Sequence, residues 1–281
     1  MRLLRKARNS EIGGLSFMGE VIVITSGKGG VGKTTSAANI GTALTMMGKK
    51  VALVDTDIGL RNLDVVMGLE NRIVYDIVDV VEENCKLKQA LIKDRRYEGL
   101  FLLPAAQTRD KNAVNEDQMR KICEDLKVEF DFVIIDCPAG IEQGFKNAIA
   151  GADRAFVVTT PEVSAVRDAD RIVGLLESSS LPKPQLILNR IRTKMVRKGE
   201  MMDADDIVEL LSIKLIGAIP DDENVIIQTN KGEPSVTNSK SLSGKAYMET
   251  AKRILGEEID VTIPGREKGL FTKIKKIFKK N

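Results

Sequence analysis

The segment TSGKGGVGKTT, residues 25–35, places two lysines among four glycines. It contains the pattern G-x-x-x-x-G-K-[ST], in which backbone N–H groups of a glycine-rich turn cradle phosphate oxygens. In this pattern Lys33 reaches the β- and γ-phosphates of a nucleotide, and the Thr34 hydroxyl binds Mg²⁺. The pattern also arises by chance in glycine-rich turns, but here it follows an apolar run and opens a helical one, as a phosphate loop requires. The predicted nucleotide-binding residues are Gly27, Lys28, Gly29, Gly30, Val31, Gly32, Lys33, Thr34 and Thr35.

Acidic residues that could complete such a site end two other apolar runs. In FVIIDCPAG, Asp136 stands where an acid at a strand end helps to hold Mg²⁺, although it could instead cap the next turn. In VDTDIGLRNLD, Asp57 is our candidate for orienting the attacking water, because the chain has no histidine and Gln143 is less well placed. The alternative for Asp57 is a solvated residue of a polar turn. The predicted metal-site residues are Thr34, Asp57 and Asp136.

Short β-branched runs alternate with helical patterns along the chain. Runs that are apolar throughout and separated by helices are typical of a parallel sheet covered on both faces. The first helix is expected from Thr34 to about Met47, with Gly48 ending it. We therefore predict an α/β fold of the P-loop NTPase type, with a mostly parallel central sheet flanked by helices. The predicted strands are Val21–Thr25, Val51–Asp55, Leu100–Ala105, Phe132–Asp136, Ala155–Thr160, Gln185–Arg190 and Leu215–Pro220.

The composition narrows the range of functions. Aromatic residues make up 4% of the chain and tryptophan is absent, which argues against a base-stacking nucleic-acid surface. The lack of histidine excludes catalysis by an imidazole base and any His-ligated metal. The three cysteines are an odd number without CxxC spacing, so we expect reduced thiols instead of disulfides or a zinc site.

Basic residues are concentrated at the two ends of the chain. Residues 1–17 have a net charge of +3 and residues 266–281 of +6, which leaves −6 for the body between them. An acidic body is a poor non-specific DNA binder, because duplex affinity depends on neutralising phosphates, and no nucleic-acid partner is expected. The first 17 residues are interpreted as a disordered extension upstream of a functional start at Met18. The predicted divisions are an N-terminal extension (1–17), a P-loop domain (18–258), a linker (259–269) and a C-terminal amphipathic helix (270–281).

The last segment, GLFTKIKKIFKKN, sorts its residues by type. Bulky apolar side chains recur at helical spacing and lysines fill the other face, the pattern of a helix that lies in the plane of an anionic membrane. A helix docked on the core rarely has lysines this dense, and a solvated tail would not have a sorted apolar stripe. One tail should bind weakly, because ordering a short helix costs backbone entropy, whereas two tails on one dimer gain about 10²–10⁴ in avidity. The predicted membrane-binding residues are Leu270, Phe271, Ile274, Lys275, Ile277 and Phe278.

The full set of motifs resembles the deviant-Walker-A ATPases of the ParA/MinD class. Their mark is a signature lysine in the form K-G-G-x-x-G-K-T-T, here Lys28 to Thr35. The segments DTDIGLRNLDVVMGLENRIVYDIVDVV, LLPAAQTRDK, DCPAGIEQG and TTPEVSAVRDADRI resemble the division-site branch of that class, and the similarity covers nearly the whole chain from residue 18. GLRNLD and SAVRDADR are much more specific than the phosphate loop.

This resemblance implies an ATPase that uses ATP and Mg²⁺ and is activated by forming a homodimer. Lys28 would act across the dimer interface on the partner's nucleotide, and Lys33 within its own chain. A cation supplied in trans would couple hydrolysis to dimerisation, because cations stabilise the transition state of phosphoryl transfer. The catalytic residues that the resemblance implies are Lys28, Lys33 and Asp57. It also implies adenine contacts at Asn189, Pro220 and Asp221, and a partner surface at Glu162, Arg167, Asp168 and Asp170, which otherwise read as an ordinary surface helix.

The same resemblance implies a nucleotide-switched membrane scaffold with a MinC-type division inhibitor and a MinE-type activator as partners. It would be cytoplasmic and peripheral on the inner face of the cell membrane, with a plastid stroma as the less favoured location. Two alternatives stay open at this point. A ParA-type DNA-partitioning ATPase is opposed by the acidic body and the amphipathic tail, and a flagellar-number regulator of the same superfamily can share such a tail.

Overall fold

The computed structural model describes residues 18–110, 112–179, 181 and 183–266. It has one sheet with the strand order β3-β4-β2-β5-β1-β6-β7-β8. The antiparallel pair is β3 and β4, and the other neighbours are parallel. This confirms the predicted α/β architecture, while the predicted N-terminal extension and C-terminal helix lie outside the described residues. The strands are β1 (Glu20–Thr25), β2 (Val51–Asp55), β3 (Ile92–Lys93), β4 (Leu100–Leu103), β5 (Phe132–Asp136), β6 (Arg154–Thr159), β7 (Gln185–Ile191) and β8 (Lys214–Pro220).

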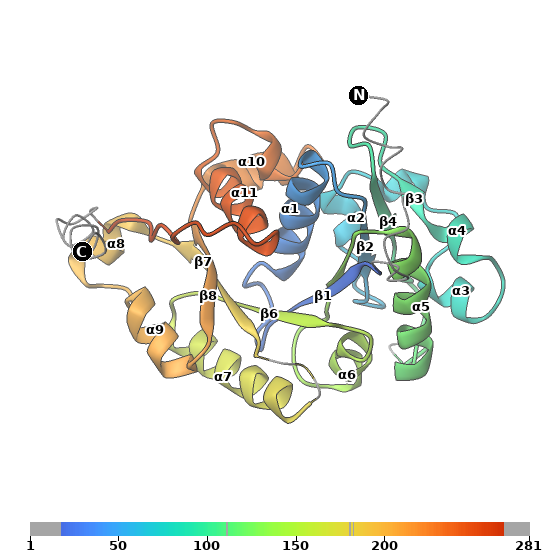
Figure 1. Ribbon diagram of the computed structural model, residues 1–281, viewed down its shortest axis with the longest axis horizontal. Helices are drawn as coiled ribbons and strands as arrows, with labels where there is room; N and C mark the ends of the chain where they lie inside the picture. Colours follow the sequence, from blue (N-terminus) through green and yellow to red (C-terminus); the bar gives the residue numbers. More distant parts are fainter. Residues whose placement is uncertain (1–17, 111, 180, 182, 267–281) are drawn as a thin grey trace, which may run out of the picture.

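Helices cover both faces of this sheet (Figure 1). Side chains of β1 alternate between two apolar clusters: Val21 and Val23 belong to the one formed with α5, α6, α7 and α9, whereas Ile22 and Ile24 belong to the one formed with α1 and α11. A strand buried on both faces explains why these runs are apolar throughout. The α-helices are α1 (Lys33–Met46), α2 (Leu63–Val66), α3 (Ile77–Val81), α4 (Leu87–Ala90), α5 (Glu116–Glu129), α6 (Gln143–Ile149), α7 (Val163–Ser178), α8 (Thr193–Lys198), α9 (Ala204–Leu211), α10 (Glu223–Thr229) and α11 (Leu242–Ile254).

All seven predicted strands are present, with ends that differ from the prediction by at most two residues. The strand that the sequence did not indicate is β3, which has only two residues and pairs antiparallel with β4 at the edge of the sheet. The first helix runs from Lys33 to Met46, close to the predicted span, and Gly48 follows it with a left-handed φ of 81°. Within the described residues, no helix is long and apolar enough to cross a membrane.

The topology brings the predicted functional residues to one edge of the sheet. The phosphate loop joins β1 to α1, and β1 lies directly beside β5. Asp55 and Asp136 end the neighbouring strands β2 and β5 and stand opposite each other in register. The carboxyl ends of parallel strands are where such sheets bind their ligands, and the crossovers on either side of β1 open the crevice there.

Candidate active site

The phosphate loop has a backbone that depends on its glycines. Gly30 and Gly32 have φ values of 77° and 103°, in the left-handed region that side chains disfavour. At Gly32 there is also no room, because an added Cβ would lie 2.2 Å from Asn189 Nδ2. Lys33 then begins α1, so the N-terminal end of that helix meets the loop, where it favours an anion.

Long-range contacts hold this loop from two sides. Asn189 Nδ2 donates a hydrogen bond of 2.8 Å to the Val31 carbonyl, and Asn189 Oδ1 accepts one of 2.9 Å from the Arg190 N–H. On the other side, an added Cβ at Gly27 would lie 2.2 Å from the carbonyl oxygen of Asp168 in α7. The sequence did not indicate either contact, and each fixes the loop to a helix or strand far away in the chain.

The two lysines of the loop lie in different surroundings. Lys33 is buried, with 8% of its surface exposed, and its charge acts on the Asp136 carboxyl. The Lys28 side chain is 43% exposed and points to the start of α7. Its Nζ donates a hydrogen bond of 3.1 Å to Ser164 Oγ and lies 4.0 Å from Glu162 Oε2. Lys33 therefore serves the interior of the site, and Lys28 stands at its outer surface.

Two buried carboxyl groups lie side by side at the strand ends. Burial, and then the charge of Asp55, raise the pKa of Asp136, although a hydrogen bond from Thr34 opposes this. Burial also raises the pKa of Asp55, against hydrogen bonds from backbone N–H groups. Asp55 accepts these from Asp57 (2.9 Å) and Leu63 (3.1 Å), so its carboxylate organises the loop that bears Asp57. Asp55 belongs to the same segment as Asp57, VDTDIGLRNLD, but the sequence did not predict this role for it.

The donor set at this point fits Mg²⁺. In the described part of the chain, Asp136 Oδ1 is buried without a hydrogen-bond partner, and a cation beside it would offset the repulsion between the two carboxylates. Mg²⁺ is commonly held by one or two carboxylates together with phosphates and water. In keeping with that, residues 18–266, leaving out 111, 180 and 182, contain no cluster of three or more His, Cys, Asp or Glu arranged for a metal. Asp64, the third acid of the segment VDTDIGLRNLD, is buried and paired with Arg61 at 2.8 Å.

A cavity of about 480 Å³ adjoins the end of the phosphate loop. Its volume is in the range of small-molecule sites. The residues that the resemblance assigned to adenine, Asn189, Pro220 and Asp221, line it together with Gly32 and Thr35. The structure therefore brings these five residues to one cavity, and it pairs Asp221 with Arg192 at 3.0 Å.

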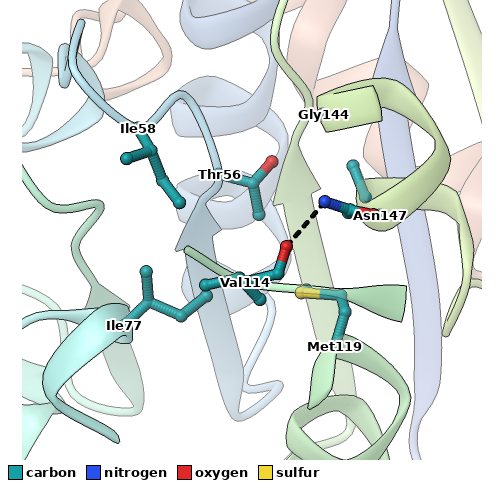
Figure 2. A pocket seen from close by; sticks show the side chains of 8 residues that line it. Thr56, Ile58, Ile77, Val114, Met119, Gly144 and Asn147 are labelled. Carbon is teal, nitrogen blue, oxygen red and sulfur yellow. Dashed lines mark hydrogen bonds between the residues drawn. The ribbon is translucent and has the colours of Figure 1, made fainter. Parts of the chain in front are cut away.

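A much smaller cavity lies behind the Asp57 loop (Figure 2). Its volume of about 10 Å³ is close to what one water molecule needs. Asn147 of α6 donates a hydrogen bond of 2.6 Å to the Val114 carbonyl across it, and Thr56 Oγ1 donates one of 2.7 Å to the Asp136 carbonyl nearby. The loop that bears Asp57 and helix α6 therefore line the same small cavity. Helix α6 follows residues 137–140 in the chain.

The predicted partner surface lies on and just before α7. Glu162, Arg167 and Asp170 are exposed, and Asp168 is half-buried because its backbone packs against Gly27. The same surface includes Ser164, which accepts the hydrogen bond from Lys28. The signature lysine and the predicted partner surface are therefore contiguous.

The fold and site together define a P-loop nucleotide-binding protein: a glycine-rich loop between a central strand and a helix, with an acid ending the adjacent strand. A family model described as an AAA domain matches residues 19–180. The chain is 60% identical to the septum site-determining protein MinD of Bacillus subtilis, over 93% of this chain and 98% of that protein. It is 55% identical to MinD of Synechocystis, over 86% and 91%. The chain therefore belongs to the family of septum site-determining MinD proteins.

Solved structures give the same result. In the MinC:MinD cell division protein complex of Aquifex aeolicus, a chain 48% identical to this one superposes with a TM-score of 0.81, covering 88% of this chain and 100% of that one. MinD of Pyrococcus horikoshii, complexed with Mg-ADP, is 29% identical with a TM-score of 0.77, covering 86% and 100%. A ParA family ATPase of Chlorobium tepidum, at 22% identity and a TM-score of 0.71, shares the fold alone. Family membership thus favours the division-site prediction over the DNA-partitioning alternative.

Proposed function

We propose that the protein is a division-site ATPase that dimerises when it binds ATP and then associates with membrane through its C-terminal helix. On the membrane it recruits a MinC-type division inhibitor, and a MinE-type activator triggers hydrolysis and release. Membership of the MinD family supports this proposal, and so does the existence of a solved complex between a relative and MinC. We place it in the cytoplasm and at the inner face of the cell membrane.

The observation that carries this proposal is the different position of the two loop lysines. A phosphate loop needs one lysine in its interior, and Lys33 is buried there. Lys28 instead stands at the surface beside Ser164 and Glu162, within reach of a molecule that approaches this face. A second copy in that position would receive Lys28 at its nucleotide, and each chain would complete the other's site.

Within one chain, the remaining residues have separate tasks in this proposal. The loop backbone and Lys33 hold the phosphates, and Asn189, Pro220 and Asp221 contact the adenine. Thr34, Asp57 and Asp136 would hold Mg²⁺, which would offset the negative charge of the phosphates. Asp57 would also orient the attacking water, since it stands on the loop that the Asp55 carboxylate organises at the ends of β2 and β5.

Co-sedimentation with liposomes tests the proposal directly. The full chain is spun with anionic vesicles in the presence of ADP or ATP, beside a DNA mobility-shift assay under the same conditions. We expect sedimentation with ATP, little with ADP, and no ATP-dependent shift of DNA. The alternative, a ParA-type protein, predicts the reverse, so ATP-dependent DNA binding without vesicle binding would overturn the proposal.

A further inference from the structure

A second cleft lies beside the nucleotide cavity and differs from it in chemistry. It has a volume of about 370 Å³ and is lined by Met195, Met201, Met202 and Val163, with Glu162 and Glu200 among its charged residues. Val163 is 61% exposed. Methionine side chains are flexible and polarisable, and clusters of them adapt to apolar partners of irregular shape. Arg190 and Arg192 line both this cleft and the nucleotide cavity, so the two are neighbours.

The described chain ends next to this cleft. After α11 it runs away from that helix to α8, as Figure 1 shows. Arg266, the last described residue, is anchored there by ion pairs to Asp205 (2.6 Å) and Asp203 (3.3 Å). Asp203 directly follows Met202 of the cleft, and Gly265 lies so close to Thr193, the first residue of α8, that an added Cβ would be 3.0 Å from it. The described chain therefore ends close to the methionines, and 15 residues of the sequence follow it.

We propose that these residues, 267–281, dock their apolar stripe in the methionine cleft while the protein is not dimerised. This inference rests on the proposed function, because it makes the membrane-binding segment the occupant. An extended residue spans about 3.5 Å, so a few residues after Arg266 suffice to reach the cleft. The stripe holds two phenylalanines and two isoleucines, which suit a methionine lining.

Charged residues of both signs surround the cleft. The tail carries six lysines against one glutamate. Glu162 and Glu200 line the cleft, and Asp203, Asp205 and Asp206 stand at the N-terminal end of α9 beside it. Two arginines oppose the lysines, but one of them, Arg192, is already paired with Asp221 at 3.0 Å. Asp203 and Asp205 are already paired with Arg266, Glu200 lies 3.8 Å from Lys198 and Glu162 lies 4.0 Å from Lys28. The docking therefore depends on the apolar lining, and the charges contribute little.

Docking here would make the tail respond to dimerisation. Glu162 lines the cleft and also lies 4.0 Å from the Lys28 ammonium, on the face that we propose a second copy covers. A copy that approaches Lys28 and the nucleotide would therefore compete with the tail for the same surface. ATP would release both tails of the dimer at the moment when two anchors become available. The methionine cleft thus keeps the monomer off the membrane.

Hydrogen exchange measured without lipid tests the docking by itself. The full chain and its Phe278→Glu variant are compared in ADP, with Thr272→Glu as a control that adds the same charge outside the stripe. We expect faster exchange over residues 193–203 in Phe278→Glu and unchanged exchange in Thr272→Glu. Equal exchange in all three proteins would overturn the proposal. So would protection that appears in all three only with ATP, because the occupant would then be a second copy.

Vesicle binding in ADP tests the consequence. Met202→Glu should open the cleft and raise binding of the ADP form; if the tail is docked about nine-tenths of the time, the increase is about tenfold. Met46→Glu makes the same substitution at a methionine that is 51% exposed at the end of α1, and it should leave binding unchanged. If Met202→Glu binds no better than the wild type while ATP still drives wild-type binding, the cleft does not hold the tail. If the exchange difference is present but no form binds vesicles, the docking stands and the proposed membrane function fails.

Discussion

Lys28 has a 43% exposed side chain and a hydrogen bond to Ser164, so it is poorly placed to act on the nucleotide of its own chain. We therefore expect Lys28→Ala to bind ATP normally but to lose dimerisation and about 10³-fold or more in turnover, the low end of what a cation supplied in trans contributes. Equilibrium nucleotide binding, sedimentation velocity with ATP and steady-state hydrolysis check this. Lys33→Ala is the control and should lose nucleotide binding itself. Normal hydrolysis by Lys28→Ala would refute the trans role.

Gly27 and Gly29 lie in the same loop but differ in how closely other residues pack against them. An added Cβ at Gly27 would lie 2.2 Å from the Asp168 carbonyl, whereas at Gly29 the nearest atom would be 3.9 Å away. Gly27→Ala should therefore lower the free energy of unfolding by about 1–3 kcal/mol, as overpacking does, and Gly29→Ala should change it little. Urea denaturation of both variants measures the difference. Equal stabilities would mean that α7 moves away from the loop without loss.

At the scale of single residues, the sequence predicts features that depend on residues close to one another in the chain. A phosphate loop is recognisable because its glycines, lysine and threonine act within a few residues of one another. By contrast, the bond from Asn189 to Val31 spans 158 residues, and no short pattern announces it. The contact between Gly27 and Asp168 is hidden for the same reason. The sequence therefore indicated which residues meet at the phosphate loop and its neighbouring cavity, but not what holds them in place.

Among the elements, α10 and α11 are joined through one carboxylate. Asp222 caps α10 by accepting from the Asn224 N–H (2.9 Å), and it also accepts from Ser241 Oγ (2.7 Å) and the Ser243 N–H (3.0 Å) at the start of α11. Partial burial acts to raise the pKa of Asp222, but these hydrogen bonds outweigh it and lower the pKa well below its ordinary value. The resulting stabilisation is present above the unfolded pKa of about 4 and is lost as the pH falls below it.

The variant Asp222→Asn tests how the lowered pKa of this carboxyl group contributes to stability. The amide replaces one accepting oxygen with an NH₂ group, and we expect about 1–2 kcal/mol less stability at pH 7. The gap to the wild type should narrow as the pH falls below about 4, where the wild type loses its advantage. Urea unfolding at pH 7, 5 and 3.5 measures it. Asp221→Asn is the control, since its exposed pair with Arg192 contributes little, and a gap that does not change with pH would contradict the assignment.

Strands that are buried on both faces have an apolar pattern that the sequence reveals. Elements of two to four residues are too short to show a pattern, and the sequence did not indicate them. β1 and β5 are apolar throughout because both of their faces are covered, so the sequence alone located them. β3 has two residues at the edge of the sheet, one buried and one exposed, which is too short for any periodicity to appear. Short helices such as α2 and α4, with four residues each, escape notice for the same reason.

At the scale of the whole molecule, the membrane binding that we propose would depend on how many tails one particle carries. Each apolar residue of the stripe gains at most about 1.5–3 kcal/mol if fully buried, and ordering the helix opposes that gain. One tail is therefore a weak anchor, and the step from monomer to dimer supplies about 10²–10⁴ in avidity. Avidity alone would thereby couple nucleotide state to membrane binding, and release of the tails from the methionine cleft would add to it.

Phe278→Glu tests this coupling, because it removes one large apolar side chain and places a charge in the stripe. We expect the variant to bind ATP and dimerise like the wild type, while its ATP-dependent vesicle binding falls to the background seen in ADP. Thr272→Glu changes the net charge equally on the polar face and should lose only about 1 kcal/mol per tail. Sedimentation with vesicles, beside sedimentation velocity without them, separates the two effects. Vesicle binding that survives Phe278→Glu would show that the anchor lies elsewhere in the chain, and a lost dimer would show that the tail contributes to assembly.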